Sequence, residues 1–188
     1  MPPDISLLGR ALLGLLMDEP LSGYDIRGIF TQTPLATFSD SPGAIYPALA
    51  RLEGAGFVRG RVERSAGLRQ RKVFQLTPAG RAAFQAWLRA PVTRDALVRD
   101  TEELMLRFSF MDRGIGKDAS AAFLRALRQE LHGYLPELKS HLEAHGAKMP
   151  LSGRLALESG IRAYDAMLDW TTDALAAYGT RGGARRKT

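Results

Sequence analysis

The sequence predicts a mostly α-helical protein with one small β-wing, a strand pair joined by a tight turn. Apolar residues recur at helical spacing along most of the chain, whereas residues 57–64 and 69–76 alternate as strands do. Near the C-terminus the apolar spacing tightens to a 3.5-residue repeat, which is typical of a coiled coil or helical bundle. At 188 residues, the chain suits one domain with an extension or two small domains.

Two amphipathic helices are predicted at the N-terminus. The first carries the apolar stripe Ile5, Leu8, Leu12, Leu15 and Leu16. Pro20 ends it, because proline interrupts a helix. Ser22, with Asp25 three residues later, has the spacing of a capping box and predicts the start of the second helix. That helix carries Ile26, Ile29 and Phe30.

A third helix is predicted after the loop of residues 33–40. Ser41 can cap it, with Pro42 at the first helical position, where the missing N–H leaves no hydrogen bond unmade. Its buried stripe is Ile45, Leu49 and Leu52, and Gly56 offers a left-handed stop. Pro47 is unfavourable inside a helix, and propensity alone would begin the helix there. The longer helix rests on the family resemblance given below.

The predicted wing follows this helix directly. Its strands, residues 57–64 and 69–76, are joined by the turn Ser65-Ala66-Gly67-Leu68. Thr77 and Pro78 then begin a fourth helix. That helix has Phe84, Trp87 and Leu88 on one side.

Pro91 closes the first predicted domain, residues 1–90, and the remainder is predicted to be helical. One helix, broken at residues 112–116, is marked by Leu97, Leu104, Phe108 and Met111. A long helix, bent at Gly133 and Pro136, is marked by Phe123, Leu127, Leu131, Tyr134, Leu138 and Leu142. The last helix steps alternately by four and three residues along Leu157, Ile161, Tyr164, Leu168, Thr171, Leu175 and Tyr178. Residues 91–180 are thus a helical region, and a basic tail at 181–188 is predicted to be disordered.

Positive charge is concentrated on the predicted wing. The chain carries a net charge of +6, and residues 51–72 alone carry +5, whereas residues 91–180 carry −2. A basic patch of this kind favours an anionic partner.

Composition excludes several protein classes. The sequence contains no run of 18 apolar residues, so no membrane span is predicted. The N-terminus lacks the basic region of a signal peptide. The absence of cysteine rules out a disulfide framework and a zinc finger, and it fits a reducing cytoplasm. A glycine-rich phosphate loop and a GxSxG elbow are also absent, so neither an enzyme nor a cofactor is predicted.

The third helix has an outer face suited to a DNA groove. Ser41 and the free amides of the first turn suit a phosphate oxygen, and small Gly43 and Ala44 allow close approach to a duplex. Tyr46 can bond a phosphate or a base edge, and Arg51 lies near the same face. The alternative is a surface helix in an ordinary α/β domain.

Basic residues flank the predicted wing turn: Arg64, Arg69, Arg71 and Lys72. Such a hairpin reaches into a minor groove or along a phosphate backbone, where it confers salt dependence rather than sequence choice. The alternative is a solvated charged face.

The residues of the first domain resemble the PadR family of bacterial transcriptional regulators. The resemblance covers residues 5–90 and rests on Leu12–Leu16, Pro20–Ile26, Ser41–Pro47, Arg51–Glu53, Gly56–Val58, Arg71–Thr77 and Gly80-Arg81. It implies a winged helix-turn-helix DNA-binding domain and adds Ser22 and Tyr24, at the family's glycine-tyrosine pair, to the expected DNA contacts. The wing turn, residues 65–69, departs from the usual family pattern.

The second half is similar to the AphA-like subgroup of that family, through Arg99-Asp100 and Leu104–Arg107. Membership implies a homodimer built on the C-terminal helices, frequent repression and, in some members, release by a small effector. Two heads related by a two-fold axis in turn predict a palindromic operator in double-stranded DNA. The expected dimerisation residues are Leu157, Ile161, Tyr164, Leu168, Leu175 and Tyr178.

The sequence also allows two alternative functions. The domain could be a protein-interaction module that uses a winged helix, or a small-molecule sensor with weak DNA binding. Trp87, Trp170, Tyr164 and Tyr134 could line an effector pocket, although aromatic residues at helical spacing are more often core. His141 and His145 have the i, i+4 spacing of a metal pair, with Glu137 and Glu143 nearby, but the sequence has no further ligand cluster, so no metal is predicted.

Overall fold

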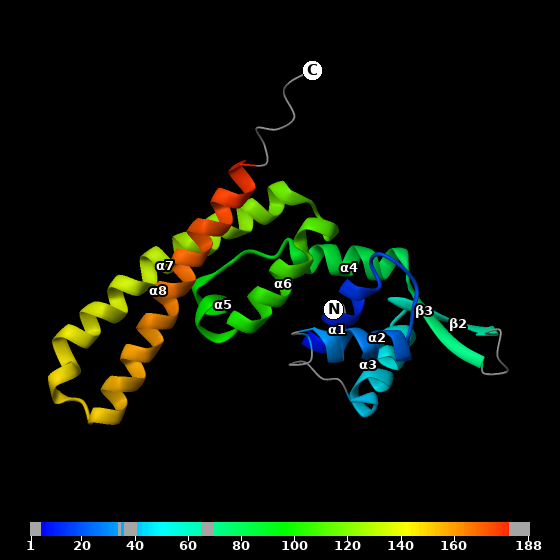
Figure 1. The fold of residues 1–188 in the computed structure, drawn as a ribbon, viewed down its shortest axis with the longest axis horizontal. Coiled ribbons are helices and arrows are strands. Elements are labelled where there is room, and N and C mark those ends of the chain that lie inside the picture. Colours follow the sequence, from blue (N-terminus) through cyan, green and yellow to red (C-terminus); the bar gives the residue numbers. More distant parts are fainter. Residues whose placement is uncertain (1–4, 34, 36–40, 65–69, 181–188) are drawn as a thin grey trace, which may run out of the picture. The chain divides into compact units, whose positions relative to one another are not determined.

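Helices and one three-stranded antiparallel sheet make up the computed structural model, which describes residues 5–33, 35, 41–64 and 70–180 (Figure 1). This confirms the predicted fold class, mostly α with a small β-wing. The chain divides into two compact units, Met1–Ala90 with Arg113–Ile115, and Pro91–Asp112 with Gly116–Thr188. The predicted turn 65–68, Arg69 and the predicted tail 181–188 lie outside the described residues.

The helices of the first unit begin where the sequence places caps. They are α1 Leu7–Leu15, α2 Gly23–Gln32, α3 Pro42–Gly54 and α4 Pro78–Leu88. The side chain of Ser41 accepts a hydrogen bond from the N–H of Gly43 (3.2 Å), and that of Thr77 accepts one from Gly80 (3.0 Å). α3 continues through Pro47, as the family resemblance implied, and Gly56 follows it with a φ of +76°.

The sheet joins α2 to the wing. Its strands are β1 Leu21–Ser22, β2 Val58–Arg64 and β3 Gln70–Leu76, in the order β1-β3-β2. β2 and β3 pair antiparallel along their whole length and extend as a hairpin (Figure 1). β1 was not predicted, because two residues are too short to show strand periodicity and the strand pairs with the distant β3.

Apolar residues from all four helices close the core of the first unit. The largest fully buried side chains are Leu12, Leu13, Ile26, Phe30, Ile45, Leu49, Phe84 and Leu88. Burying the inner stripe of α3 in this way leaves the opposite side of the helix facing solvent.

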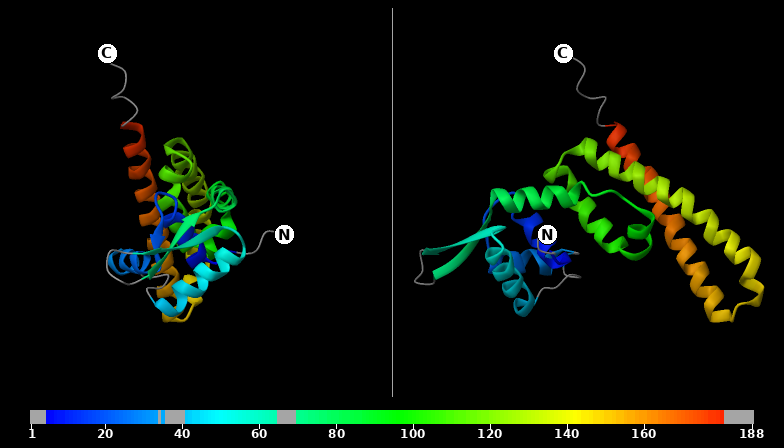
Figure 2. Two further views of the ribbon diagram at one scale, coloured as in Figure 1. Left: turned by 90° about the vertical axis from the view of Figure 1, so that its right-hand side faces the viewer. Right: turned by 180° about the vertical axis from the view of Figure 1, so that it is seen from behind.

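The second unit is entirely helical among its described residues. It contains α5 Arg94–Arg99, most of α6 Thr101–Gly114, α7 Lys117–His145, the short η2 Gly146–Lys148 and α8 Leu151–Thr180. α7 and α8 lie side by side in antiparallel directions (Figures 1 and 2). None of the helices in the described part of the chain is long and apolar enough to cross a membrane.

The prediction of one helix through residues 97–111 was wrong. Asp100 adopts φ −130° and ψ 34°, which separates α5 from α6. Aspartate hydrogen-bonds nearby backbone groups outside helices and is therefore poor inside them, and apolar spacing alone does not register such a break. The break predicted after α6 is present, with Gly116 at a φ of +93°.

Candidate nucleic-acid interface

Two exposed tyrosines dominate the surface formed by α2 and α3. Tyr24, in the first turn of α2, is 78% exposed, and Tyr46, in α3, is 50% exposed. Tyrosine combines a large apolar ring with a polar hydroxyl, and such side chains are enriched at protein interfaces.

Tyr46 lies close over the start of α2. A Cβ atom on Gly23 would lie 2.7 Å from Cζ and 2.9 Å from the hydroxyl oxygen of Tyr46. Glycine at this position leaves room for the tyrosine ring, so Gly23 of α2 and Tyr46 of α3 fit together across the two helices. The family pattern contained this glycine, but its contact with Tyr46 could not be read from the sequence.

The rest of the outer face of α3 is open to solvent. Ser41, Gly43 and Arg51 are exposed, and Ala44 is half-buried. Among the described residues, the hydroxyl oxygen of Ser41 is the one heavy atom near a Cβ placed on Gly43, at 3.4 Å, an ordinary contact distance. The helix thus presents small residues at its N-terminal end, a tyrosine in the middle and an arginine near its C-terminal end.

Ser22, an expected DNA contact, is buried and caps α2 instead of facing solvent. It is 4% exposed, and its hydroxyl donates to Oδ2 of Asp25 (2.7 Å) and accepts from the Asp25 N–H (3.2 Å). Asp25 in turn accepts from the Ser22 N–H (2.9 Å), which completes the predicted capping box. These hydrogen bonds from Ser22 hold the pKa of Asp25 below its usual value. Ser22 fixes the start of α2, beside Tyr24, and its side chain is turned away from solvent.

The two faces of the wing carry different residues. Arg59, Arg61 and Glu63 of β2 share one face with Arg71 and Gln75 of β3, as the register shows. On this face Arg61 pairs with Glu63 (2.8 Å), and Arg71 lies 3.9 Å from the same carboxylate. Arg59 and Arg61 were counted in the basic charge of the wing but were not predicted as contacts. Arg64 ends β2.

The opposite face of the wing is tied to α3. Lys72 bonds Oε2 of Glu53 (2.6 Å), and the Gly60 N–H donates to Oε1 of Glu53 (3.0 Å). The bond from Lys72 is the main reason why the pKa of Glu53 lies below its usual value. Neither Glu53 nor Gly60 was predicted as a functional residue, because the pairing depends on the register between strand and helix.

The stripe predicted for dimerisation faces α7 within the same chain. Ile161 is 6% exposed and Thr171 is fully buried in a single copy. Tyr164 packs against Tyr134 of α7, with ring centroids 5.4 Å apart, and Tyr178 packs against Phe108 of α6 (6.5 Å). A heptad pattern predicts that a face is covered but not by which helix, so part of this stripe is occupied before any second copy binds.

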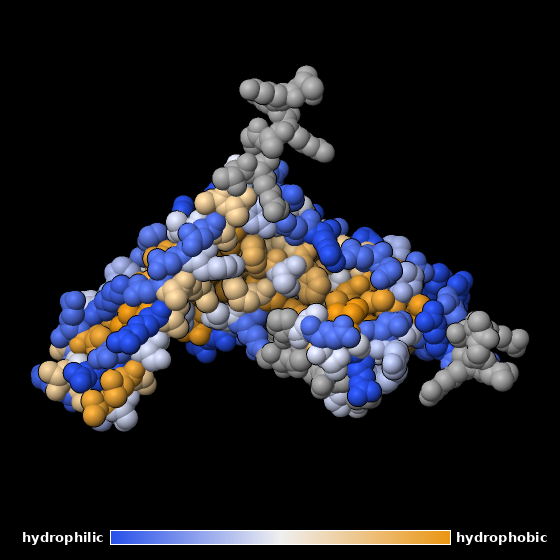
Figure 3. Space-filling view, in the orientation of Figure 1, coloured by the Kyte–Doolittle hydropathy of each residue, from blue (hydrophilic) through white to orange (hydrophobic). Residues whose placement is uncertain are grey.

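Exposed apolar residues of α8 lie elsewhere. Leu155 is 50% exposed and Leu151 and Trp170 are also exposed, and apolar surface is visible along the α7–α8 hairpin (Figure 3). The predicted residues Leu157, Leu168 and Leu175 are half-buried. Apolar surface thus remains on α8 after α7 has packed against it.

The aromatic residues considered for an effector pocket make packing contacts. Besides the Tyr134–Tyr164 pair, Trp87 contacts Phe84 (5.4 Å) and Trp170 contacts Phe108 (5.5 Å). The rings of His141 and His145 are 4.7 Å apart, and the described residues contain no group of three side chains suited to a metal ion.

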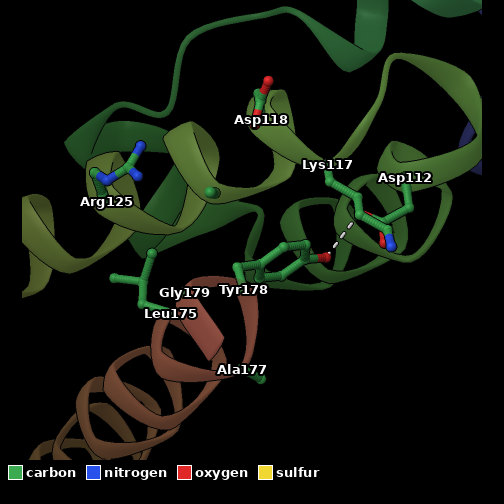
Figure 4. A pocket seen from close by; sticks show the side chains of 9 residues that line it. Asp112, Lys117, Asp118, Arg125, Leu175, Ala177, Tyr178 and Gly179 are labelled. Atoms are coloured by element: carbon green, nitrogen blue, oxygen red, sulfur yellow. Dashed lines mark hydrogen bonds between the residues drawn. The ribbon is translucent and has the colours of Figure 1, made fainter. Parts of the chain in front are cut away.

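A pocket of about 430 Å³ lies within the second unit (Figure 4). It is lined by the end of α6, the first turns of α7 and the end of α8. The hydroxyl of Tyr178 donates to Asp112 (2.7 Å) across it, and Lys117 and Arg125 supply positive charge from α7 (Figure 4). Within the described part of the chain, neither Lys117 nor Arg125 forms an ion pair.

Comparison with known proteins finds one family and several relatives. Residues 12–86 match the Transcriptional regulator PadR-like family. The chain is 28% identical to the negative transcriptional regulator PadR of Bacillus subtilis over 90% of this chain and 96% of that protein. Among solved structures, B. subtilis PadR in complex with operator DNA matches with 25% identity and a TM-score of 0.45, over 94% of this chain and 99% of the other. The same protein in complex with p-coumaric acid matches with 24% identity and a TM-score of 0.41, over 93% and 99% of the two chains. The matched family and relatives are transcriptional regulators, not enzymes.

Proposed function

We propose that this chain, which belongs to the PadR-like family of transcriptional regulators, binds a palindromic operator as a homodimer and represses transcription from it. The observation that carries the proposal is the open outer face of α3, with Tyr46 at its centre and a basic wing next to it in the same unit. A bacterial regulator with this function would act in the cytoplasm, where its DNA lies. Repression follows the character of the B. subtilis relative, which is named a negative regulator.

On this proposal α3 enters the major groove and the wing follows the backbone or the minor groove. Gly43 and Ala44 let the helix approach the duplex, Tyr24 and Tyr46 contact a phosphate or a base edge, and the first turn of α3, capped by Ser41, faces a phosphate. Arg51, Arg64, Arg69 and Arg71 supply positive charge. In the interaction-module alternative the same exposed tyrosines contact a partner protein, and the basic wing is a solvated face or meets an acidic surface of that partner.

Dimerisation is proposed to use apolar surface that α8 keeps exposed in one copy. Leu155 and Trp170 are exposed there, and the half-buried Leu157, Leu168 and Leu175 can add their remaining surface. Two heads related by a two-fold axis require a palindromic operator, with half-sites about one helical turn apart or a multiple of it.

Response to a small effector is a second proposal, supported by the pocket in the second unit. Its volume of about 430 Å³ suits a small molecule, and its lining offers charged groups of both signs, Lys117 and Arg125 beside Asp112 and Asp118. The p-coumaric acid complex of the B. subtilis protein makes an aromatic acid a reasonable first compound to test.

Two variants separate sequence choice from general affinity. Tyr46→Ala should weaken binding to the operator more than binding to scrambled DNA, because α3 reads the site. Arg71→Gln should weaken both and lower the slope of log affinity against log salt by about 0.9, as expected for one lost phosphate contact. Lys148→Gln, on the helical unit, is the matched charge control. If Tyr46→Ala and Arg71→Gln both bind both DNAs as the wild type does, DNA binding by this surface is refuted.

A further inference from the structure

We infer that Glu53, Gly60 and Lys72 form a clamp that holds the wing at a fixed angle to α3, and that Lys72 is a positioning residue rather than a phosphate contact. The inference rests on the proposed DNA binding and assigns a role within it. A single carboxylate, at the end of α3, bonds the N–H of Gly60 in β2 and the ammonium group of Lys72 in β3. One side chain thereby joins the helix to both strands of the wing.

Gly60 leaves the space that this arrangement occupies. A Cβ atom at this position would collide with Cε of Lys72 and would lie 2.8 Å from Oε1 of Glu53. Because Gly60 has no side chain, the lysine stem can cross the strand and the carboxylate can reach the backbone N–H beneath it.

The direction of the Lys72 side chain supports a role inside the domain. Lys72 pairs with Val62, whereas Gly60 pairs with Phe74, two residues nearer the base of the hairpin. The lysine stem packs over Gly60, and its ammonium lies 5.2 Å from the centroid of the Phe74 ring. The side chain therefore runs from the wing back toward α3, and its charge is already met by Glu53.

Arg71, the next residue, provides the contrast. It points to the opposite face of the hairpin, is more than half exposed, and lies 3.9 Å from its nearest carboxylate, that of Glu63. Arg71 is thus available to a phosphate, whereas the ammonium of Lys72 is 2.6 Å from Glu53.

The clamp matters for binding because α3 and the wing must meet the same duplex together. Fixing their relative angle before binding removes an ordering cost that the complex would otherwise bear. The pair itself is partly exposed, and pairs of this kind add little to stability. Its loss should therefore loosen the wing without unfolding the domain.

Glu53→Gln gives the sharpest test. Removing an acidic side chain from a DNA-facing domain would, by charge alone, strengthen DNA binding. The clamp predicts the reverse, a loss of operator affinity of about 3- to 10-fold, the range expected for coupled contacts. Lys72→Gln should give a similar loss with an unchanged salt slope, the double variant no further loss, and Lys72→Arg near-normal affinity.

The measurement is operator affinity by fluorescence anisotropy at several salt concentrations, with thermal unfolding to verify that each variant is folded. Arg71→Gln, which should lower the salt slope, is the matched control on the same strand. Tighter binding by Glu53→Gln, additive losses in the double variant, or a lower slope for Lys72→Gln would each overturn the clamp while leaving the proposed function in place. A wild-type protein that binds no DNA would overturn the proposed function and this inference with it.

Discussion

At the scale of single residues, Gly23 determines where the side chain of Tyr46 lies. Gly23 sits in the first turn of α2 and leaves space for the ring of Tyr46, which comes from α3. Gly28, further along α2, has no other described residue within 4 Å of where a Cβ would be, apart from its own helix turn. The two glycines of one helix therefore have opposite requirements.

Gly23→Ala should displace Tyr46 and lower operator affinity about 10-fold, a loss in the range measured for contacting residues. Gly28→Ala is the matched control, because alanine is favoured over glycine in a helix by up to about 1 kcal/mol. It should raise the melting temperature and leave DNA affinity unchanged. Anisotropy titration and thermal unfolding of both variants check this, and equal affinities for the two variants would contradict the role given to Gly23.

A second prediction at this scale concerns pH. The hydrogen bonds from Ser22 lower the pKa of Asp25 in the folded state, so the capping box stabilises the fold above the unfolded pKa, near 3.8. That contribution is lost as pH falls through the lower folded value. Asp25→Asn should cost about 1 kcal/mol at pH 7, the usual value of a helix cap, and the difference from wild type should shrink below pH 3.8. Denaturant unfolding at pH 7 and pH 3 measures it, and a constant difference would refute the assignment.

At the scale of helices and strands, the sequence predicted features that depend on neighbouring residues but missed those that depend on distant ones. Ser22, Ser41 and Thr77 each mark a helix start through their own neighbours, and all three cap helices in the structure. β1 and the Glu53–Lys72 bond depend on partners far along the chain, so no local pattern announced them. Pro47 shows the reverse case, since a propensity argument pointed the wrong way and the family pattern was right.

The helix α8 shows how far periodicity reaches. The 3.5-residue repeat correctly marked a covered face, but α7 of the same chain covers much of it. For the predicted DNA contacts, the buried stripe of α3 was enough to identify the outer side of that helix. The burial of Ser22 and the ion pair between Lys72 and Glu53 could be seen only in the folded structure.

Substitutions in α8 should therefore have different effects by position. Leu155→Asn, at an exposed site, should give folded monomers because it removes apolar surface proposed for the second copy. Ile161→Asn should destabilise the α7–α8 pair itself, by roughly 2–5 kcal/mol for a buried aliphatic side chain made polar. Light scattering and circular dichroism distinguish the two results, and a Leu155→Asn protein that stays dimeric would contradict the proposed surface.

At the scale of the whole molecule, the two units differ in charge and in architecture. The first unit holds the basic wing and the open face of α3, whereas residues 91–180, which fall almost entirely in the second unit, carry a net charge of −2. A helical region with net negative charge is not attracted to the DNA backbone, so DNA affinity should come from the first unit. The second unit should bring two copies of the first unit together by dimerisation.

The most direct measurement is fluorescence anisotropy of the full chain with the DNA upstream of its own gene, at low and moderate salt, with scrambled DNA as competitor. Sequence-specific regulation predicts binding that survives an excess of the competitor and weakens with salt along a straight line in log affinity. Binding that the competitor abolishes, and that vanishes at moderate salt, would contradict an operator at this site and would favour the interaction-module alternative.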